Sequence, residues 1–307
     1  MQKTLPPDFV LNSKYLIEKT LGQGGFGITY KAMSSLTGKP SCIKELFVEN
    51  SSTRTEDYSV RTTDMKGVYS FQDLMDRFFL EADQLAAFNH PNIVKIHERF
   101  EANGTGYFVM DYVEGLTLKQ LVKQDGRIPK DQAIPMIYQL LDALEVVHSQ
   151  NILHRDIKPG NVLISPGGKA TLIDFGAARD FLEGKSQAHT TIVTPGFAPP
   201  EQYQENHERH ASGDIYSLAA TAYYMLTAKR PPSAPERIFG ELIPPNKIVP
   251  EIDSAFSSAL VTALSLDPED RFQNVSEFRA AMNQVAGKDE QQPRREGILA
   301  WIRDLFR

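Results

Sequence analysis

The hydrophobic pattern of this chain changes from strand-like to helix-like near residue 112, and no other feature constrains its fold as strongly. Residues 15–46 and 93–113 contain short apolar runs of strand length, the second set around an Asn-Gly turn. Beyond them, residues 131–150 and 212–228 are long and apolar enough to be core helices. We therefore expect an α+β fold, with a small strand-rich lobe followed by a larger, mostly helical lobe.

Two further segments complete the small lobe. Residues 71–88 carry apolar side chains at helical spacing and predict one amphipathic helix. The preceding stretch, 47–70, has no clear period, and eight Ser or Thr residues lie within 51–70, which is the composition of a loop. This insertion is either a phosphorylation or docking segment or a tolerated surface loop, because long loops add little closure entropy.

Bulk composition excludes several classes of protein. The 307 residues carry 33 Lys and Arg against 39 Asp and Glu, a net charge of −6, which argues against a sequence-independent nucleic-acid binder. The single cysteine excludes an intramolecular disulfide framework and favours a reducing compartment. Neither a signal peptide nor an apolar run of membrane-spanning length is visible, so we expect a cytoplasmic protein without a transmembrane segment.

A glycine-rich stretch, LGQGGFG, contains Gly22, Gly24 and Gly27 in the pattern GxGxxG. The same pattern occurs in dinucleotide-binding domains, where the glycines open a helix. Here the stretch ITYKAM follows and continues as a strand, which favours a hairpin that covers phosphates from above. A plain hairpin turn is the alternative.

Two polar clusters between apolar runs carry the chemistry. The stretch ILHRDIKPGNVLI places Asp156, Lys158 and Asn161 close together, and LIDFG follows with Asp174. Carboxylate and amide oxygens are the ligands that Mg²⁺ selects. Together with the fixed charge of Lys158, they form a set suited to stabilising phosphoryl charge and orienting a hydroxyl group.

The ordered set of glycine loop, Ile-Lys, HRD-x-K-x-x-N and DFG resembles the eukaryotic-like (Hanks-type) serine/threonine protein kinases, in their bacterial branch. The resemblance covers residues 14–286 and implies a two-lobed kinase fold. Its implied parts are an N-lobe at 14–110, a hinge at 111–116 and a C-lobe at 117–286. Outside them lie an N-terminal lead-in, 1–13, and a polar linker with an amphipathic C-terminal helix, 287–307.

By this resemblance, Lys44 holds the α- and β-phosphates of ATP and is itself held by Glu81, in the middle of FFLEADQL. Met110 is the implied gatekeeper, and the backbone of Asp111 and Val113 meets adenine. Cys42 stands where the family usually has alanine; an inert core cysteine is the alternative. The implied nucleotide-binding positions are Leu21, Gly22, Gly24, Gly25, Gly27, Thr29, Cys42, Lys44, Met110, Asp111, Val113 and Leu163.

The resemblance also assigns the catalytic and structural residues of the C-lobe. Asp156 accepts or orients the substrate hydroxyl, Lys158 neutralises the γ-phosphoryl group, and Asn161 and Asp174 hold Mg²⁺. Thr194 belongs to the ledge for a peptide substrate. The positions implied to be structural are Glu201 paired with Arg271, and Asp214.

The segment between Asp174 and Glu201 contains QAHTTIVTP. A phosphate on Thr190 or Thr191 would pair with Arg155 and order this loop. The alternative is an unmodified polar loop.

The C-terminal stretch GILAWIRDLFR places the apolar residues of 298–306 on one face of a helix. Three interpretations remain open: packing on the helical lobe, binding a partner, or lying on a membrane surface. The acidic residue on the polar face weakens the membrane interpretation.

The expected function is transfer of the γ-phosphate of ATP, with Mg²⁺, to Ser or Thr hydroxyls of proteins, including the enzyme itself (EC 2.7.11.1). One alternative is a catalytically inactive kinase-like scaffold, which would lack a phosphate-binding or metal-binding residue; this sequence retains all of them. Another is a small-molecule kinase, against which Thr194 and the Pro-Pro-Glu segment favour protein substrates.

Overall fold

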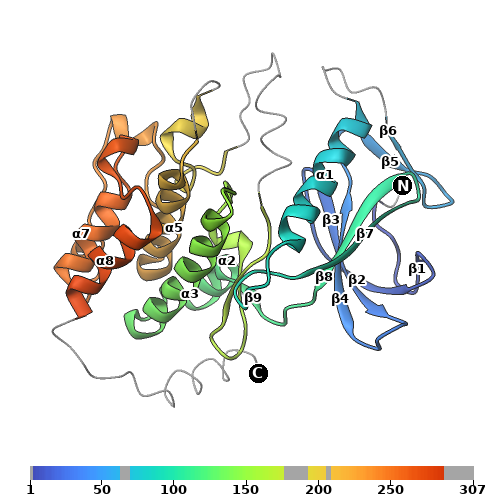
Figure 1. Cartoon of the computed structure of the whole chain (residues 1–307), viewed down its shortest axis with the longest axis horizontal. Coiled ribbons are helices and arrows are strands. Elements are labelled where there is room, and N and C mark those ends of the chain that lie inside the picture. Colours follow the sequence, from blue (N-terminus) through green and yellow to red (C-terminus); the bar gives the residue numbers. More distant parts are fainter. Residues whose placement is uncertain (1–2, 63–69, 176–192, 205–208, 287–307) are drawn as a thin grey trace. The chain divides into compact units, whose positions relative to one another are not determined.

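The computed structural model describes residues 3–62, 70–175, 193–204 and 209–286. Of these, residues 284–286 are described as backbone only. The described residues form two compact units, drawn in Figure 1. The first unit comprises residues up to 89 together with 94–113, and the second comprises 90–93 and the residues from 114 onward that are described. This arrangement of a sheet-rich and a helix-rich unit agrees with the expected α+β class.

A six-stranded antiparallel sheet forms the body of the first unit, in the order β1-β2-β3-β4-β8-β7. Along β3 partly buried and fully buried side chains alternate without a break, as expected for a strand with one face against a core. The strands are β1 (Val10–Leu11), β2 (Tyr15–Gly24), β3 (Gly27–Ser34), β4 (Pro40–Leu46), β7 (Ile96–Ala102) and β8 (Thr105–Asp111).

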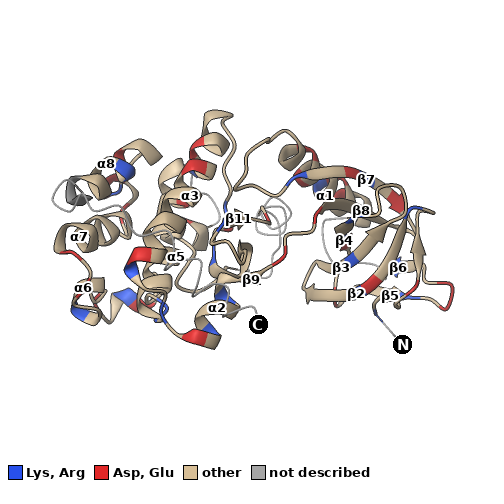
Figure 2. Ribbon diagram, turned by 90° about the horizontal axis from the view of Figure 1, so that it is seen from below, with Lys and Arg blue, Asp and Glu red and all other residues tan. Residues whose placement is uncertain are grey.

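The turn between β7 and β8 contains the Asn-Gly pair that the sequence predicts. Asn103 and Gly104 have φ angles of 51° and 70°. Positive φ at both central residues is the requirement of the type I′ turn, which matches the twist of a hairpin. On β7 itself Glu98, Arg99 and Glu101 mix both signs of charge (Figure 2).

Helix α1 (Phe71–Ala86) is the predicted amphipathic helix and packs on β7 and β8. It begins at a capping box in which Ser70 and Asp73 bond each other's backbone N–H groups. Its buried stripe includes Phe78, Leu85 and the carboxylate of Glu81. Because an acidic side chain lies in an otherwise apolar stripe, a cationic partner is required.

The insertion at 47–70 differs from the predicted loop. It contains a short antiparallel hairpin, β5 (Ser52–Arg54) and β6 (Val60–Thr62). Arg54 and Val60 are buried, with 4% and 7% of their surface exposed. Its composition suggested a loop because the side chain that anchors the hairpin is a charged one, and periodicity rules count charged residues as exposed. Residues 63–69 lie outside the described part of the chain.

The N-terminal lead-in is part of the first unit's core and not a separate segment. Leu5 and Leu11 are each 1% exposed. They join a cluster on one face of the sheet that also includes Ile17, Ile43 and Tyr107. Residues 3–11 and the β5–β6 hairpin therefore pack on the sheet face that carries this cluster.

The second unit is mostly helical and carries a small sheet in the order β11-β10-β9. Helix α5 is buried along nearly its whole length and contacts α3, α6, α7 and α8, so it is the central helix of the unit. The α-helices and strands of this unit are β9 (Leu116–Thr117), α2 (Leu118–Asp125), α3 (Lys130–Ser149), β10 (Val162–Ile164), β11 (Ala170–Leu172), α5 (Ala211–Thr227), α6 (Pro245–Ile248), α7 (Ser254–Ala263) and α8 (Val275–Ala286).

None of the helices in the described part of the chain has the length and apolar character to cross a membrane. The predicted amphipathic helix at 298–306 lies outside the described residues, as do Thr190 and Thr191.

Candidate active site

Lys44 lies on β4, and its ammonium Nζ is 3.0 Å from Oε1 of Glu81 on α1. The Glu81 side chain is 1% exposed and that of Lys44 is 19% exposed. The Lys44 Nζ also lies 5.4 Å from the centroid of the Phe108 ring. One side of the ammonium is thus held by a buried carboxylate and an aromatic face, while the lysine side chain stays partly exposed.

The glycine-rich stretch forms the turn between β2 and β3. Gly24 pairs with Gly27, so Gly25 and Phe26 are the two residues of the turn. The chain continues as strand β3 and opens no helix there, which sets aside the dinucleotide-binding interpretation. Gly27 faces β4 closely, since a Cβ built on it would lie 2.8 Å from the carbonyl oxygen of Glu45.

This close approach predicts the effect of a single methyl group. Gly27→Ala places Cβ inside contact distance of the Glu45 carbonyl, so β3 and β4 must separate, and we expect a loss of about 1–3 kcal/mol in the free energy of unfolding. Gly25→Ala is the matched control, because no atom lies within 4 Å of a Cβ built there. Urea titrations of the two variants measure the difference, and equal stabilities would contradict the argument.

In the predicted catalytic loop, Lys158 and Asn161 both bind the carboxylate of Asp156. Nζ of Lys158 lies 2.7 Å and 3.0 Å from the two oxygens of Asp156. The amide of Asn161 donates through Nδ2 to Oδ2 of Asp156 at 2.7 Å and to its backbone carbonyl at 2.9 Å. Asp156 is therefore fixed in one orientation by two neighbours that arrive from the same short loop.

His154, two residues before Asp156, is a buried residue of this loop. Its side chain is fully buried, and its ring stacks on Phe175 with 4.2 Å between the centroids. Burial lowers the pKa of the His154 imidazole, because desolvation outweighs the nearby carboxylates. A neutral histidine at this position acts as a packing residue.

Asp214, in the first turn of α5, holds the backbone of the same loop. Its oxygens accept from the N–H groups of His154 at 2.8 Å and Arg155 at 2.7 Å, and His148 Nε2 lies 2.9 Å away. Arg155 has a φ of 66°, which a side-chain-bearing residue rarely adopts. The carboxylate of Asp214 therefore supports a strained backbone conformation directly before Asp156.

The ionisation of Asp214 gives the fold a pH dependence. Burial alone would raise the pKa of its carboxyl, but the hydrogen bond and charge of His148 and the backbone N–H donors hold that pKa below its ordinary value of 3.8. The ionised group thus stabilises the fold fully above that value and progressively less as the pH falls through the folded-state pKa. Asp214→Asn should cost about 2–3 kcal/mol near neutral pH, and the difference from the wild type should shrink below about pH 3.8. Unfolding titrations from about pH 7 to about pH 2.5 check this, and a gap that stays constant would contradict it.

In the second unit, Arg271 and Glu201 form a buried ion pair. The guanidinium donates to both carboxylate oxygens, at 2.7 Å and 2.8 Å, and also to the carbonyl oxygens of Ser265 and Leu266. The Arg271 side chain is fully buried and that of Glu201 is 6% exposed. This pair anchors the segment around Pro200 to the loop before α8.

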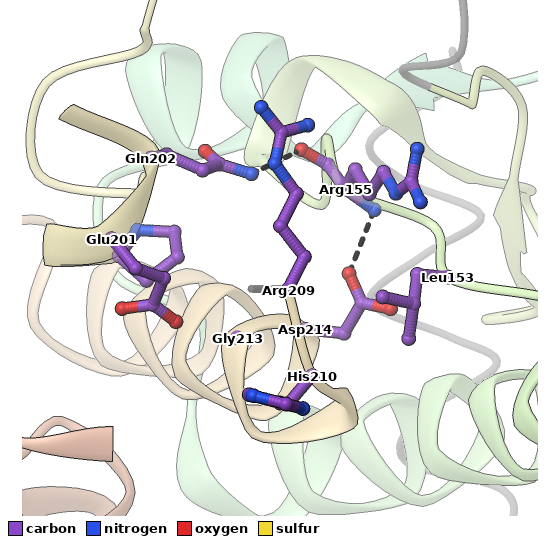
Figure 3. Close-up of a pocket in the computed structure, with 9 residues that line it drawn as sticks. Leu153, Arg155, Glu201, Gln202, Arg209, His210, Gly213 and Asp214 are labelled. Carbon is purple, nitrogen blue, oxygen red and sulfur yellow. Dashed lines mark hydrogen bonds between the residues drawn. The ribbon is translucent and has the colours of Figure 1, made fainter. Parts of the chain in front are cut away.

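Between these anchors lies a pocket lined by Leu153, Arg155, Pro199, Glu201, Gln202, Arg209, His210, Gly213 and Asp214. In Figure 3 the Gln202 amide donates to the Arg155 carbonyl, at 2.9 Å, and the Arg155 N–H donates to Asp214. Burial lowers the pKa of the Arg209 guanidinium, and the charge of Arg155 lowers it further. Gln202, Arg209 and His210 were not predicted. For the last two, the only signal in the sequence is a pair of basic residues just before α5.

The remaining predicted positions lie on described elements. Cys42 on β4 is registered opposite Met110 on β8, and both are buried. Thr29 is registered opposite Lys44, and Leu163 belongs to β10 of the second unit. The Thr194 carbonyl accepts from the N–H groups of Phe197 and Ala198 at 3.1 Å each, so Thr194 begins a tight turn.

A metal would find oxygen donors of two kinds here. Within the described residues no three His, Cys, Asp or Glu side chains are grouped as a metal site. The predicted magnesium ligands are the carboxylate of Asp174 and the amide of Asn161. Because Nδ2 of Asn161 is committed to Asp156, its Oδ1 is the end of the amide that remains for a cation.

Comparison with known proteins agrees with this geometry. Residues 15–278 match the family model described as "Protein kinase domain". Among curated proteins, the chain is 34% identical over 232 residues to "Serine/threonine-protein kinase PknB" of Mycobacterium leprae, covering 71% of this chain and 37% of that one. It is 31% identical over 286 residues to "Serine/threonine-protein kinase PknA" of Nostoc sp., covering 89% and 47%. The chain thus spans less than half the length of these relatives.

Solved structures give the same result. The structure described as "PpkA-294 apo form" superposes with a TM-score of 0.83 at 30% identity, covering 92% of this chain and all of that one. A structure of Rad53 in complex with AMP-PNP has a TM-score of 0.67 at 23% identity, covering 89% of this chain and 65% of that one, and shows likeness of fold alone. The matched model spans most of the chain, and the two curated relatives named above are both called serine/threonine-protein kinases. The chain belongs to the protein kinase domain family, in its bacterial serine/threonine branch.

Proposed function

We propose that this chain transfers the γ-phosphate of ATP to serine or threonine hydroxyls of proteins, with Mg²⁺ as cofactor. One observation carries the proposal: Asp156 is held by Lys158 and Asn161 in a single loop, with an acceptor carboxylate and a cation side by side. In such a loop the carboxylate meets the substrate hydroxyl and the ammonium meets the transferred phosphoryl group.

The proposed step exchanges one phosphorus–oxygen bond for another. The substrate oxygen forms a bond to the γ-phosphorus while the bond from that phosphorus to the leaving oxygen of ADP breaks, and the hydroxyl proton passes to a carboxylate oxygen of Asp156. Lys158 shares the charge that develops on the phosphoryl oxygens. Since Asp156 is already oriented by two hydrogen-bonding neighbours, little reorganisation is required when the substrate arrives.

Asn161 and Asp174 are the proposed holders of Mg²⁺, with hard oxygen donors of the kind that this ion prefers. When bound, the ion neutralises charge on the β- and γ-phosphates. The commitment of the Asn161 donor end to Asp156 fixes which atom of the amide faces a cation.

Nucleotide contacts are proposed for residues of the first unit. Lys44, oriented by Glu81, would bind the α- and β-phosphates, and the turn at Gly25 would cover them. The N–H of Asp111 already donates to the Lys95 carbonyl at 3.0 Å, so Asp111 would offer its own carbonyl to adenine and Val113 would offer its N–H. The small buried Cys42 would pack against the base.

Protein substrates and a reducing, cytoplasmic setting belong to the same proposal. The turn at Thr194 and the Glu201 anchor support a peptide ledge, and a chain with a single cysteine forms no intramolecular disulfide. A catalytically inactive scaffold is the second candidate, but no observation favours it, since the phosphate-binding and metal-binding side chains are all present.

Transfer of labelled γ-phosphate tests the proposal. Wild-type protein, Lys44→Ala and Asp156→Asn are incubated with labelled ATP and Mg²⁺, alone and with a generic basic protein. We expect label on the wild-type reactions and almost none on the two variants. Equal labelling in all three, or none in the wild type, would end the assignment.

Self-modification on Thr190 or Thr191 remains a prediction. Arg155, which lines the pocket before α5, is its proposed phosphate partner. Intact-mass analysis after incubation with Mg-ATP measures it, and an unmodified loop in a protein that phosphorylates substrates would contradict it.

A further inference from the structure

A fully buried carboxylate follows Lys44 directly in the sequence. Glu45 is 0% exposed, and its two oxygens accept three hydrogen bonds. Oε2 accepts from Arg54 Nη2 at 2.6 Å and from the Tyr30 hydroxyl at 2.7 Å, and Oε1 accepts from the Tyr107 hydroxyl at 2.6 Å. We call Glu45, Arg54, Tyr30 and Tyr107 the outer-face cluster, because they lie on the face of the sheet opposite Lys44.

Burial and the neighbouring carboxylate favour the protonated forms of the two tyrosines and of Arg54 in the outer-face cluster. Burial, with the charge of Glu45 next, raises the pKa of both the Tyr30 and the Tyr107 hydroxyls, so both remain donors. Burial alone would lower the pKa of the Arg54 guanidinium, but Glu45 outweighs it and the pKa is raised. Arg54 therefore supplies the buried positive charge that Glu45 needs.

Strand geometry couples this cluster to Lys44. Successive side chains of a strand point to opposite faces, so Lys44 meets Glu81 and Phe108 on one face while Glu45 meets the outer-face cluster on the other. The Lys44–Glu45 backbone is thus held from both sides of the sheet. Its Glu45 carbonyl is also the atom that Gly27 approaches.

The insertion that carries Arg54 is tied to the glycine-rich turn as well. Phe47 N–H donates to the Phe26 carbonyl at 3.1 Å, and Glu49 N–H donates to the Gly25 carbonyl at 3.0 Å. The Ser52 hydroxyl accepts from the Val48 N–H at 3.0 Å, which closes the insertion on itself. One segment therefore contacts both proposed phosphate-binding elements of the first unit.

Arg54 uses its other nitrogens to hold two further segments. Its Nε donates to the Lys3 carbonyl at 2.8 Å, and Nη1 donates to the Tyr58 carbonyl at 2.9 Å. The hairpin is docked a second time where Val60 N–H donates to the Asn103 carbonyl at 2.7 Å. A planar guanidinium with three bonded nitrogens is a rigid connector that a lysine could not replace.

We propose that Arg54 is a positioning residue for Lys44, acting through Glu45, and that the 47–62 insertion is a built-in support for the phosphate-binding strands. This proposal rests on the nucleotide role assigned to Lys44. A tolerated surface loop would not place its arginine in the core, against the residue next to the phosphate-binding lysine.

The test uses a double variant, Glu45→Gln/Arg54→Met, which removes both charges and leaves no unpaired buried ion. Its matched control is Leu11→Ala, which opens a cavity in the same core without changing a charge and is chosen to lower stability. Each protein is assayed well below its melting temperature, so that both are folded. The readouts are kcat and KM for ATP and, separately, the rate at which the Lys44 amine is labelled by an amine-reactive reagent, followed by peptide mass spectrometry.

We expect the double variant to lose about tenfold in kcat/KM and to show faster Lys44 labelling, because a small displacement of a phosphate-binding group is costly. The Leu11→Ala protein should keep wild-type kinetics and labelling at the same temperature. If the double variant does not fold, Arg54→Lys keeps the charge with fewer bonds and should show an intermediate loss. Wild-type kinetics and labelling in whichever variant folds would overturn the proposal.

The labelling readout separates this proposal from the proposed function. A wild-type protein that transfers no phosphate would end the kinase assignment, yet Lys44 labelling would still report whether Arg54 positions the amine. A wild-type protein that is active, with variants that match it in both readouts, would end only the role of Arg54.

Discussion

Replacing Asp156 by asparagine is expected to lower kcat by about 10³-fold, while KM for ATP and the melting temperature change little. The amide cannot take a proton from the substrate hydroxyl, but it fills nearly the same volume between Lys158 and Asn161. Steady-state phosphorylation assays at saturating ATP, run beside thermal unfolding, measure the two effects separately.

Asp125→Asn is the matched control, because Asp125 is an exposed aspartate at the end of α2 and its loss of charge is the same. We expect wild-type kcat from this variant. An Asp156→Asn protein that keeps even one tenth of the wild-type kcat would show that proton transfer to Asp156 is not required.

Breaking the Glu201–Arg271 pair is expected to have the largest effect on stability. Glu201→Gln leaves the fully buried guanidinium of Arg271 without its counter-charge, which should cost about 3–5 kcal/mol in the free energy of unfolding. Denaturant titrations of the isolated variant measure this loss.

The chain offers a control pair of the same residue types at its surface. Arg230 and Glu236 also form a two-bond pair, at 2.9 Å and 3.0 Å, but both side chains are about half exposed. Glu236→Gln should therefore destabilise the fold far less than Glu201→Gln, because solvent screens the exposed pair. Equal effects of the two substitutions would mean that burial of Arg271 carries no penalty.

Much of the fold could be predicted because its main elements are long and regular. The alternation along β3, the Asn103-Gly104 turn and the helical stripe of α1 follow directly from local rules. The short elements could not be found in this way: β9 has two residues and α2 has eight, too few for a period to be visible.

The site was only partly visible in the sequence. Asp156, Lys158 and Asn161 are neighbours in the chain, so their spacing alone brings them together. The partner of Lys44 is 37 positions away, and it was named from a family resemblance and not from local pattern.

The outer-face cluster was not visible at all. Arg54 looks like one polar residue in a polar stretch, and only the tertiary fold shows that it is buried against Glu45. The arrangement of Gln202 and Arg209 around Arg155 has the same character, because long-range burial decides it. Such residues are counted as exposed by every rule that reads charge alone.

The hold of Asp214 on the backbone of His154 and Arg155 also has a consequence for the order in which the chain acquires activity. The acceptor lies some sixty residues downstream of the amides it serves, so during synthesis the catalytic loop exists for a time without the group that stabilises its left-handed residue. A nascent chain that ends before α5 should therefore leave this loop unformed, even though every residue of the HRD stretch has been made. Competence would appear only after the central helix has docked, which makes the emergence of α5 a checkpoint between a folded scaffold and a working enzyme.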